Sequence, residues 1–202
     1  TAALLRFNGM FALALWDRRE RTLLLARDRY GIKPLYYAQQ GHRFAFGSEQ
    51  KAITAQPDFQ RKLNKPALLE YFTFQNIFTD QTLLEDIHLL PAGHHALLDL
   101  KPKTSHLKLS SYWDYRFREP AHPAARQDYI EELDRLFRQA VCRQLVSDVE
   151  LGAYLSGGMD SGSITAIAAR HFPYLKSFTC GFDLSSASGI ELAFDERAKA
   201  EA

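Results

Sequence analysis

The sequence predicts a fold in two parts, an α+β region built on antiparallel strands and then an α/β region that begins a parallel sheet. Residues 10–48 contain short apolar runs separated by polar or glycine turns, a pattern typical of β-hairpins. Residues 151–182 contain an apolar run, a glycine turn, a helical pattern and a second apolar run. That order is typical of a βαβ unit, whose two strands are parallel.

The boundary between the two parts lies in a proline-rich stretch. Residues 118–125 (REPAHPAA) have no hydrophobic periodicity, which is typical of an interdomain linker. We therefore expect one domain at residues 1–117, a linker at 118–126 and a second domain at 127–202.

The first domain is expected to begin with two hairpins. The apolar run 11–16 ends at a polar turn and is followed by a second run at 22–26. The runs 35–38 and 43–46 are joined across Gly41, which supplies the backbone conformation that tight turns need.

A helix and two further strands are expected to complete this domain. Residues 65–74 predict a helix, because Asn64 is a favourable N-cap and Pro66 suits the first turn. Strands are expected at 94–100, after a Pro-Ala-Gly turn, and at 107–115.

The second domain is expected to start with a helix at residues 128–146. Its apolar residues recur at helical spacing, at Tyr129, Leu133, Leu136, Phe137, Ala140 and Val141. These residues suit either an interface or packing within the domain. An interface would be consistent with a homodimer. A strand at 151–155, a helix at about 161–170 and a strand at 175–182 then form the βαβ unit.

Composition excludes several classes of function. The 202 residues include 25 basic and 24 acidic side chains, so the net charge of +1 gives no bulk attraction to nucleic acid or to a membrane surface. No apolar run approaches the roughly 18 residues that cross a membrane. The two cysteines, Cys142 and Cys180, form no CxxC pair, which argues against a disulfide framework or zinc site and favours the cytoplasm.

The strongest functional signal is the sequence SGGMDS at residues 156–161. It follows a predicted strand and precedes a predicted helix, where α/β sheets bind ligands. Two glycines let backbone N–H groups approach an anion, and the helix directs its positive end to the same point. Ser156 and Ser161 add hydroxyl groups, and Asp160 can hold Mg²⁺ against phosphate oxygens.

Two other interpretations of this loop fit its sequence less well. The Gly-Lys-Ser/Thr ending of a Walker A loop is missing, so a kinase or GTPase is not expected. A glycine turn with a serine cap is common before helices, but the complete pattern in a βαβ setting favours a nucleotide site.

The loop and four motifs of the first domain carry a family resemblance. SGGMDSG resembles the PP-loop of ATP pyrophosphatases, which activate a carboxylate or carbonyl as an adenylate and release pyrophosphate. Upstream, four stretches resemble the glutaminase domain of glutamine-dependent asparagine synthetases. They are FNGMFA at 7–12, ARDRYGIKPLYY at 26–37, AFGSE at 45–49 and LLPAGH at 89–94. SDV at 147–149 fits the same family.

This resemblance implies a more specific fold class. The first domain would be the C-terminal part of an Ntn-hydrolase-type antiparallel sandwich, and the second would be the start of a parallel-sheet PP-loop domain.

The resemblance also implies ligands for particular residues. Asn8 and Gly9 would line the glutamine pocket, although a plain turn before a strand is an equal alternative. Asp160 would hold the magnesium ion. The residues that would bind ATP are Tyr154, Leu155, Ser156, Gly157, Gly158, Asp160, Ser161 and Cys180.

Several chemically capable residues are expected to be structural instead. We expect Arg27 and Asp28 to form an ion pair or a clamp on a turn. Cys142 lies on the apolar side of a helix and is expected to be a core residue. The backbone of Cys180 would contact ATP, but its side chain is expected to be small and buried. The acidic pair at 195–196 resembles one that opens a helix in the family, without an assigned role.

The resemblance further implies that catalytic groups lie outside the chain. The family attacks glutamine with an N-terminal cysteine, and Thr1 stands too close to FNGMF to replace it. We therefore expect that nucleophile upstream of Thr1 and the acceptor pocket beyond Ala202, as in an internal piece of a longer protein.

The expected function is a glutamine-dependent asparagine synthase that uses ATP and Mg²⁺ as cofactors. Its partners would be glutamine, ATP and a carboxylate acceptor, aspartate by default. A related amidotransferase with another acceptor, such as a surface sugar or a β-lactam precursor, remains an alternative, as does a non-catalytic homologue.

Overall fold

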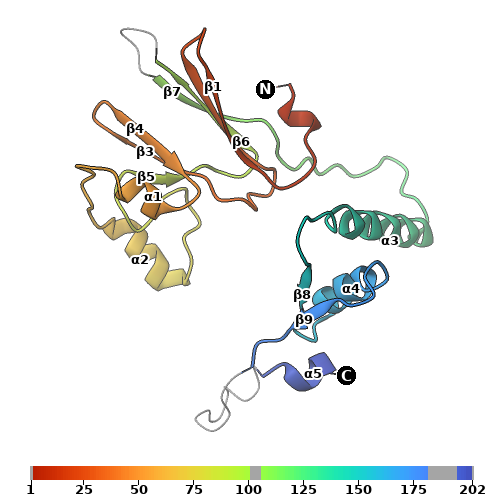
Figure 1. The fold of residues 1–202 in the computed structure, drawn as a ribbon. Coiled ribbons are helices and arrows are strands. Elements are labelled where there is room, and N and C mark those ends of the chain that lie inside the picture. The colour runs from red at the N-terminus through yellow and green to blue at the C-terminus, as the bar shows by residue number, and fades with distance from the viewer. Residues whose placement is uncertain (1, 101–105, 182–194, 202) are drawn as a thin grey trace. The chain divides into compact units, whose positions relative to one another are not determined.

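The computed structural model describes residues 2–100, 106–181 and 195–201. The chain divides into two compact units, Thr1–Phe117 and Arg118–Ala202, which are described separately below (Figure 1). In the described part of the chain, every helix is too short or too polar to cross a membrane.

A four-stranded antiparallel sheet forms one layer of the first unit. Its order is β1-β2-β6-β7, and the strands are β1 (Ala12–Asp17), β2 (Thr22–Arg27), β6 (His94–Asp99) and β7 (His106–Ser111). The first predicted hairpin is therefore confirmed, with Leu15 opposite Leu24.

Strand β7 ends four residues before the expected limit at residue 115. The backbone N–H groups of Tyr112 and Trp113 both donate to the Gly93 carbonyl, at 2.8 and 3.2 Å. Because two successive residues share one acceptor, the regular ladder cannot continue beyond Ser111.

A three-stranded antiparallel sheet forms the other layer of this unit. Its order is β4-β3-β5, with β3 (Tyr36–Gln40), β4 (Arg43–Gly47) and β5 (Ile87–Leu89). The second predicted hairpin is confirmed, and Gly41 has the positive φ of 59° expected for its turn. Strand β5 was not predicted, because three residues are too few to show a period of two.

The two sheets of the first unit share an apolar core. Leu25 and Ala96 from the four-stranded sheet pack with Leu35, Tyr37 and Leu90, and all five are buried. Burying a leucine of this size stabilises a fold by about 1.5–3 kcal/mol. This core therefore fixes the turns at residues 28–35 and 90–93, where the chain passes from a strand of one sheet to a strand of the other.

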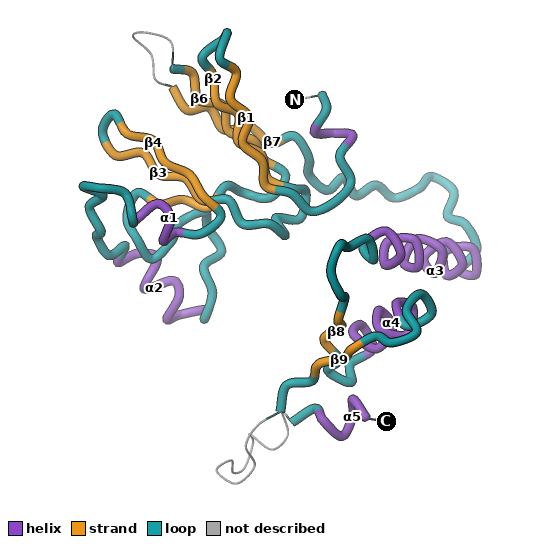
Figure 2. Tube along the Cα trace, viewed as in Figure 1, coloured by secondary structure: helices purple, strands orange, loops and turns teal. Residues whose placement is uncertain are grey.

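A short helix packs against strands β3 and β4 of the three-stranded sheet (Figure 2). Helix α1 (Gln50–Thr54) inserts Ile53 against Ala38, Ala45 and Ile87 in a second buried cluster. These strand residues alternate with Tyr37, whose side chain faces the other sheet, as the two-residue period of a strand requires.

The predicted helix at 65–74 is observed as α2 (Lys65–Phe74). The Asn64 side chain accepts a hydrogen bond from the Ala67 N–H at 3.2 Å, which confirms its expected role as N-cap. One short 3₁₀ helix, η1 (Leu4–Arg6), precedes the strands and was not predicted.

The second unit contains the helix-strand-helix-strand order expected for it. Its elements are α3 (Arg126–Arg143), β8 (Gly152–Tyr154), α4 (Met159–Ala168), β9 (Lys176–Phe178) and α5 (Arg197–Glu201). Strands β8 and β9 are parallel, with Tyr154 opposite Phe178. The described residues of this unit thus show the parallel βαβ arrangement, as a sheet of two strands.

The limits of these elements differ from the expected ones in a way that affects the loop. Helix α4 begins at Met159, two residues earlier than predicted, so Asp160 and Ser161 lie in its first turn. Helix α3 begins at Arg126, the last residue of the expected linker, and ends three residues early. Of its apolar side chains Val141 is buried, while Leu133 is 68% exposed.

Candidate functional site

The loop at residues 156–161 connects β8 to α4 through a sharp backbone turn. Gly157 has a φ of 70°, which lies in the left-handed region that favours glycine. Gly158 returns to an extended conformation and serves as the N-cap of α4. The first bond of this helix joins the Gly162 N–H to the Gly158 carbonyl at 3.0 Å. The N–H groups of residues 159–161 therefore precede the helical ladder and are available to an anion.

Two serine hydroxyls meet at the centre of this loop. Ser156 Oγ and Ser161 Oγ are 2.9 Å apart, and the Ser156 N–H donates to Ser161 Oγ at 3.2 Å. Ser161 Oγ in turn donates to the Gly158 carbonyl at 3.2 Å. These bonds fold the loop onto the end of α4, so its hydroxyls and free N–H groups lie around one short segment.

A residue from the C-terminal part of the unit limits the space at Gly157. A Cβ atom placed on Gly157 would collide with Cβ and the backbone carbon of Lys199 in α5. Glycine is therefore required here by both its φ angle and its surroundings. Lys199 was not predicted, because no motif in the sequence links it to a loop forty residues away.

The other predicted nucleotide residues lie at the ends of the two parallel strands. The Leu155 N–H donates to the Phe178 carbonyl at 2.9 Å, and the Leu155 carbonyl accepts the Thr179 hydroxyl at 2.7 Å. The Tyr154 side chain is 87% exposed. The Leu155 N–H is therefore used in pairing with the neighbouring strand, whereas the Leu155 carbonyl oxygen keeps a second lone pair that can accept another hydrogen bond.

Cys180 differs from the expectation of a small buried residue. It lies two residues beyond the last paired position of β9 and is exposed. Within the described ranges, the sheet contains two strands, so no further strand covers this position.

The predicted glutamine residues lie in the segment between η1 and β1. Asn8 and Gly9 line an open hollow of about 380 Å³ together with Arg6, Phe7 and Met10. A Cβ atom on Gly9 would meet no atom within 4 Å. The hollow places both predicted residues at one surface, where the Asn8 amide is exposed.

Asp28 ties this segment to a neighbouring turn. Its carboxylate accepts N–H groups from Phe11 at 3.3 Å, Ile32 at 3.0 Å and Lys33 at 3.0 Å. The Tyr30 N–H is a fourth donor, at 3.1 Å. Burial acts to raise the pKa of Asp28, but the four N–H donors outweigh it and hold the pKa below its usual value.

The Arg27 side chain binds backbone carbonyl groups of the same turn. Its guanidinium donates to Lys33 O at 2.9 Å, Leu90 O at 2.8 Å and Gly31 O. Burial lowers the pKa of Arg27, although Asp28 acts in the opposite direction. The expected turn clamp is therefore observed, with backbone groups as the partners of both side chains.

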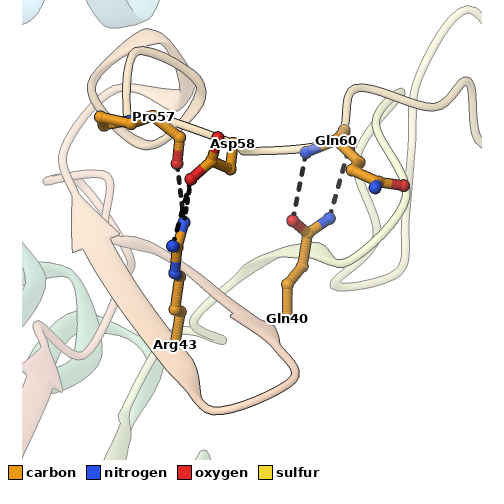
Figure 3. A network of polar contacts seen from close by, with 5 residues as sticks. All are labelled: Gln40, Arg43, Pro57, Asp58 and Gln60. Atoms are coloured by element: carbon orange, nitrogen blue, oxygen red, sulfur yellow. Dashed lines mark hydrogen bonds and ion pairs between the residues drawn. The ribbon is translucent and has the colours of Figure 1, made fainter.

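A second hollow, of about 500 Å³, lies between the β3–β4 hairpin and residues 56–60. Its polar groups bind one another (Figure 3). Gln40 exchanges two hydrogen bonds with the Gln60 backbone, at 3.2 and 3.3 Å. Arg43 donates to Pro57 O at 2.8 Å and to the Asp58 carboxylate at 3.2 Å. These contacts attach the loop to the hairpin.

No group of three or more histidine, cysteine, aspartate or glutamate side chains is arranged as a metal cage in the part of the chain that the structure describes. Asp160 is the carboxylate in the first turn of α4. Mg²⁺ typically binds one or two protein carboxylates and completes its shell with phosphate oxygens and water. A single carboxylate beside an anion loop is chemically suited to that mode.

Comparison with protein families assigns each unit to a class. Residues 1–113 match the family model described as a glutamine amidotransferase domain, and residues 132–202 match the one described as asparagine synthase. The combination defines an amidotransferase class with two successive domains.

Individual relatives narrow this class. The glutamine-hydrolysing asparagine synthetase 3 of Bacillus subtilis (strain 168) is 42% identical over 82% of this chain and 26% of its own length. The glutamine-hydrolysing asparagine synthetase 2 of the same organism is 36% identical over 80% of this chain and 23% of its own. The chain belongs to the family of glutamine-hydrolysing asparagine synthetases.

A further relative carries a different name. Amidase chyE of Penicillium rubens is 28% identical over 80% of this chain and 23% of its own length. The chain thus spans about a quarter of the length of these three curated relatives.

Proposed function

We propose that this chain belongs to a glutamine-dependent asparagine synthase that activates aspartate with ATP. In this proposal the first unit contributes to glutamine hydrolysis. The second binds ATP, and ammonia from glutamine then amidates the activated β-carboxylate, with release of AMP and pyrophosphate.

The observation that carries the proposal is the pairing of an anion-binding loop with an amidotransferase domain. Residues 156–161 gather two hydroxyls and the first N–H groups of α4 around one point. The same chain matches a glutamine amidotransferase domain over residues 1–113. Relatives that share both segments are named as glutamine-hydrolysing asparagine synthetases.

The residues of the loop have distinct roles in the proposed reaction. The N–H groups of residues 159–161 and the Ser156 hydroxyl are proposed to donate to the phosphate oxygens that leave as pyrophosphate. Because these donors are fixed by the turn at Gly157, they need little reorganisation as charge develops. Backbone groups of Tyr154, Leu155 and Cys180, which lie at or just beyond the ends of β8 and β9, are proposed to contact the adenosine.

Asp160 is proposed as the protein ligand of Mg²⁺. Its position in the first turn of α4 sets the carboxylate beside the proposed phosphate site. When bound, magnesium neutralises negative charge on the phosphate groups.

In the first unit, Asn8 is proposed to receive the α-amino group of glutamine through its side-chain oxygen. Gly9 keeps the adjacent surface open. Asp28 supports this role indirectly, because it anchors Phe11 at the end of the same segment. The thiol that attacks glutamine is proposed to be a cysteine upstream of Thr1.

An amidotransferase with another acceptor is the second candidate, and the relative named as an amidase favours it. Both candidates use the same loop, so the acceptor distinguishes them. The complete gene product would be incubated with MgATP and glutamine, with and without aspartate, and AMP and pyrophosphate would be measured.

The outcomes separate the candidates. Release of AMP and pyrophosphate that requires aspartate supports the synthase. The same release without any response to aspartate indicates a different acceptor. Absence of pyrophosphate release with all acceptors tested would leave the non-catalytic homologue as the better account.

A further inference from the structure

Two reactive side chains meet in the second unit, away from the loop at 156–161. Cys142 lies in the last turn of α3, and His171 follows the end of α4. The Sγ atom of Cys142 is 3.2 Å from Nε2 of His171. The two helices pack against each other, so the contact is part of their interface.

The charged groups around this pair are mainly basic. Arg138 lies one turn before Cys142 on α3 and interacts with its sulfur electrostatically. Asp134 forms an ion pair with Arg138 at 2.7 Å and also interacts with Arg170, which precedes His171 just beyond the end of α4. The Asp134 carboxylate thus interacts with two arginines, and the Cys142 sulfur lies against the His171 imidazole with Arg138 one helical turn away.

The pair is also reachable from solvent. Cys142 is half-buried and His171 is exposed. Reactive cysteines typically combine a positive environment with partial exposure, because the thiolate is the nucleophile and needs both stabilisation and access. A thiol beside a base is in addition the usual arrangement for nucleophilic activation.

We propose that Cys142 is a modification site, a thiol that reacts with hydrogen peroxide and related peroxides with His171 as its base. His171 Nε2 takes the thiol proton while the sulfur attacks one peroxide oxygen. An S–O bond forms and the O–O bond breaks. The departing hydroxide collects the proton as water, the sulfur becomes a sulfenic acid, and the peroxide is reduced by two electrons.

The second cysteine provides an internal reference. Cys180 is more exposed than Cys142, so accessibility alone predicts that Cys180 reacts faster. Among the described residues, no imidazole contacts the Cys180 thiol. The proposal predicts the reverse order, with Cys142 the faster of the two thiols.

The test compares both thiols in one sample of the 202-residue chain. The chain would be treated with hydrogen peroxide and dimedone, which traps sulfenic acids, and the label on each cysteine would be quantified by peptide mass spectrometry over time. We expect Cys142 to be labelled on the order of a hundredfold faster than Cys180, which is the lower end of a general-base contribution. In guanidinium chloride the two rates should become similar, because the contact with His171 is lost.

Two variants separate base catalysis from accessibility. His171→Gln should slow Cys142 to the rate of Cys180 or below it, whereas His122→Gln, in the segment before α3, should leave the ratio unchanged. Circular dichroism would establish that both variants keep the helical content of the parent chain. The proposal is overturned if Cys180 reacts faster in the folded parent chain, or if His171→Gln leaves the Cys142 rate unaltered.

Discussion

Arg27 and Asp28, which are neighbours in the sequence, bind the same turn through opposite kinds of backbone group. Arg27 donates to the carbonyls of Lys33 and Leu90, at 2.9 and 2.8 Å. Asp28 accepts the N–H groups of Lys33 and Phe11, at 3.0 and 3.3 Å. Lys33 is thus bound by both side chains, and Phe11 connects the turn to the segment that carries the predicted glutamine residues.

Replacing this carboxylate should therefore destabilise the first unit. In Asp28→Asn, one acceptor oxygen becomes an NH₂ group that faces N–H donors, so at least one buried N–H loses its partner. We expect a loss of about 2–4 kcal/mol in the free energy of unfolding, measured by urea denaturation. Asp58→Asn is the matched control, because Asp58 is exposed and pairs with Arg43 at the surface. Equal midpoints for the two variants would contradict the clamp.

The same carboxylate should contribute to the pH dependence of stability. The folded-state pKa of Asp28 lies below its usual value, so the folded chain prefers the ionised form. That contribution is complete above the ordinary aspartate pKa of about 3.9 and is lost as the pH falls through the lowered folded value. As the pH is lowered from about 5 to about 3, the urea midpoint should fall more steeply in the parent chain than in Asp28→Asn.

The N-cap of α2 offers a second test of stability. Asn64 Oδ1 accepts the Ala67 N–H, and its amide nitrogen donates to Gln81 Oε1 at 3.0 Å. Asn64→Ala removes both bonds and should cost about 1–2 kcal/mol, whereas Asn64→Asp keeps the cap and should cost less. Thermal unfolding of the two variants checks this order. A melting temperature for Asn64→Ala equal to that of the parent would show that the cap contributes nothing.

Two glycines, one in the loop at residues 156–161 and one in the helix that follows it, form a matched pair for testing the proposed nucleotide site. Gly157 has a positive φ and lies against Lys199, while a Cβ on Gly162 would meet no atom within 4 Å. Gly157→Ala should abolish MgATP binding by this chain, because the turn can no longer aim the N–H groups at one point. Gly162→Ala should bind normally and stabilise α4 by about 0.5–1 kcal/mol. Calorimetric titration checks both, and retained binding in Gly157→Ala would argue against the loop as the phosphate site.

Asp160 should set the magnesium requirement of that binding. Asp160→Asn keeps the size of the side chain in the first turn of α4 but removes its charge. We expect it to raise the Mg²⁺ concentration needed for half-maximal ATP binding by roughly tenfold or more, as loss of a charged Mg²⁺ ligand implies. The measurement is an ATP titration at several Mg²⁺ concentrations. An unchanged Mg²⁺ dependence would exclude Asp160 as the ligand.

The elements that the sequence predicts well are those whose local signals agree with their tertiary surroundings. The helix α2 has a capping asparagine and an early proline, and its observed limits match residue for residue. The hairpin of β3 and β4 has Gly41 at its turn, with a φ of 59°, and an apolar run on each side of that turn. In both cases short-range chemistry alone fixes the ends.

The elements that the sequence predicts poorly depend on distant partners. β5 has three residues and exists because it pairs with β3, fifty residues earlier. The end of β7 is set by hydrogen bonds to Gly93, which no local pattern at residue 111 reveals. The start of α4 was placed late, because serine and glycine are weak helix formers and the loop motif extends into the helix.

The candidate site divides in the same way. The sequence predicts a phosphate site at residues 156–161 because phosphate binding requires a particular order of small and polar residues, and the structure shows these residues in a turn that leads into α4. The contact of Lys199 with Gly157 and the exposure of Cys180 have no local sequence signal, because both depend on residues far apart in the chain. The contact between Cys142 and His171 joins two helices and likewise has no local sequence signal.

Transfer of oxygen from aspartate to AMP tests the central claim most directly. The complete gene product would be supplied with MgATP, glutamine and aspartate labelled with ¹⁸O in its β-carboxylate, and the AMP would be analysed by mass spectrometry. If the carboxylate is adenylylated at the loop, the ammonia-derived nitrogen displaces AMP together with one carboxylate oxygen. The account predicts one ¹⁸O atom in each AMP released. It also predicts that Gly157→Ala forms neither AMP nor labelled AMP. Formation of unlabelled AMP, or of ADP and labelled phosphate, would contradict it.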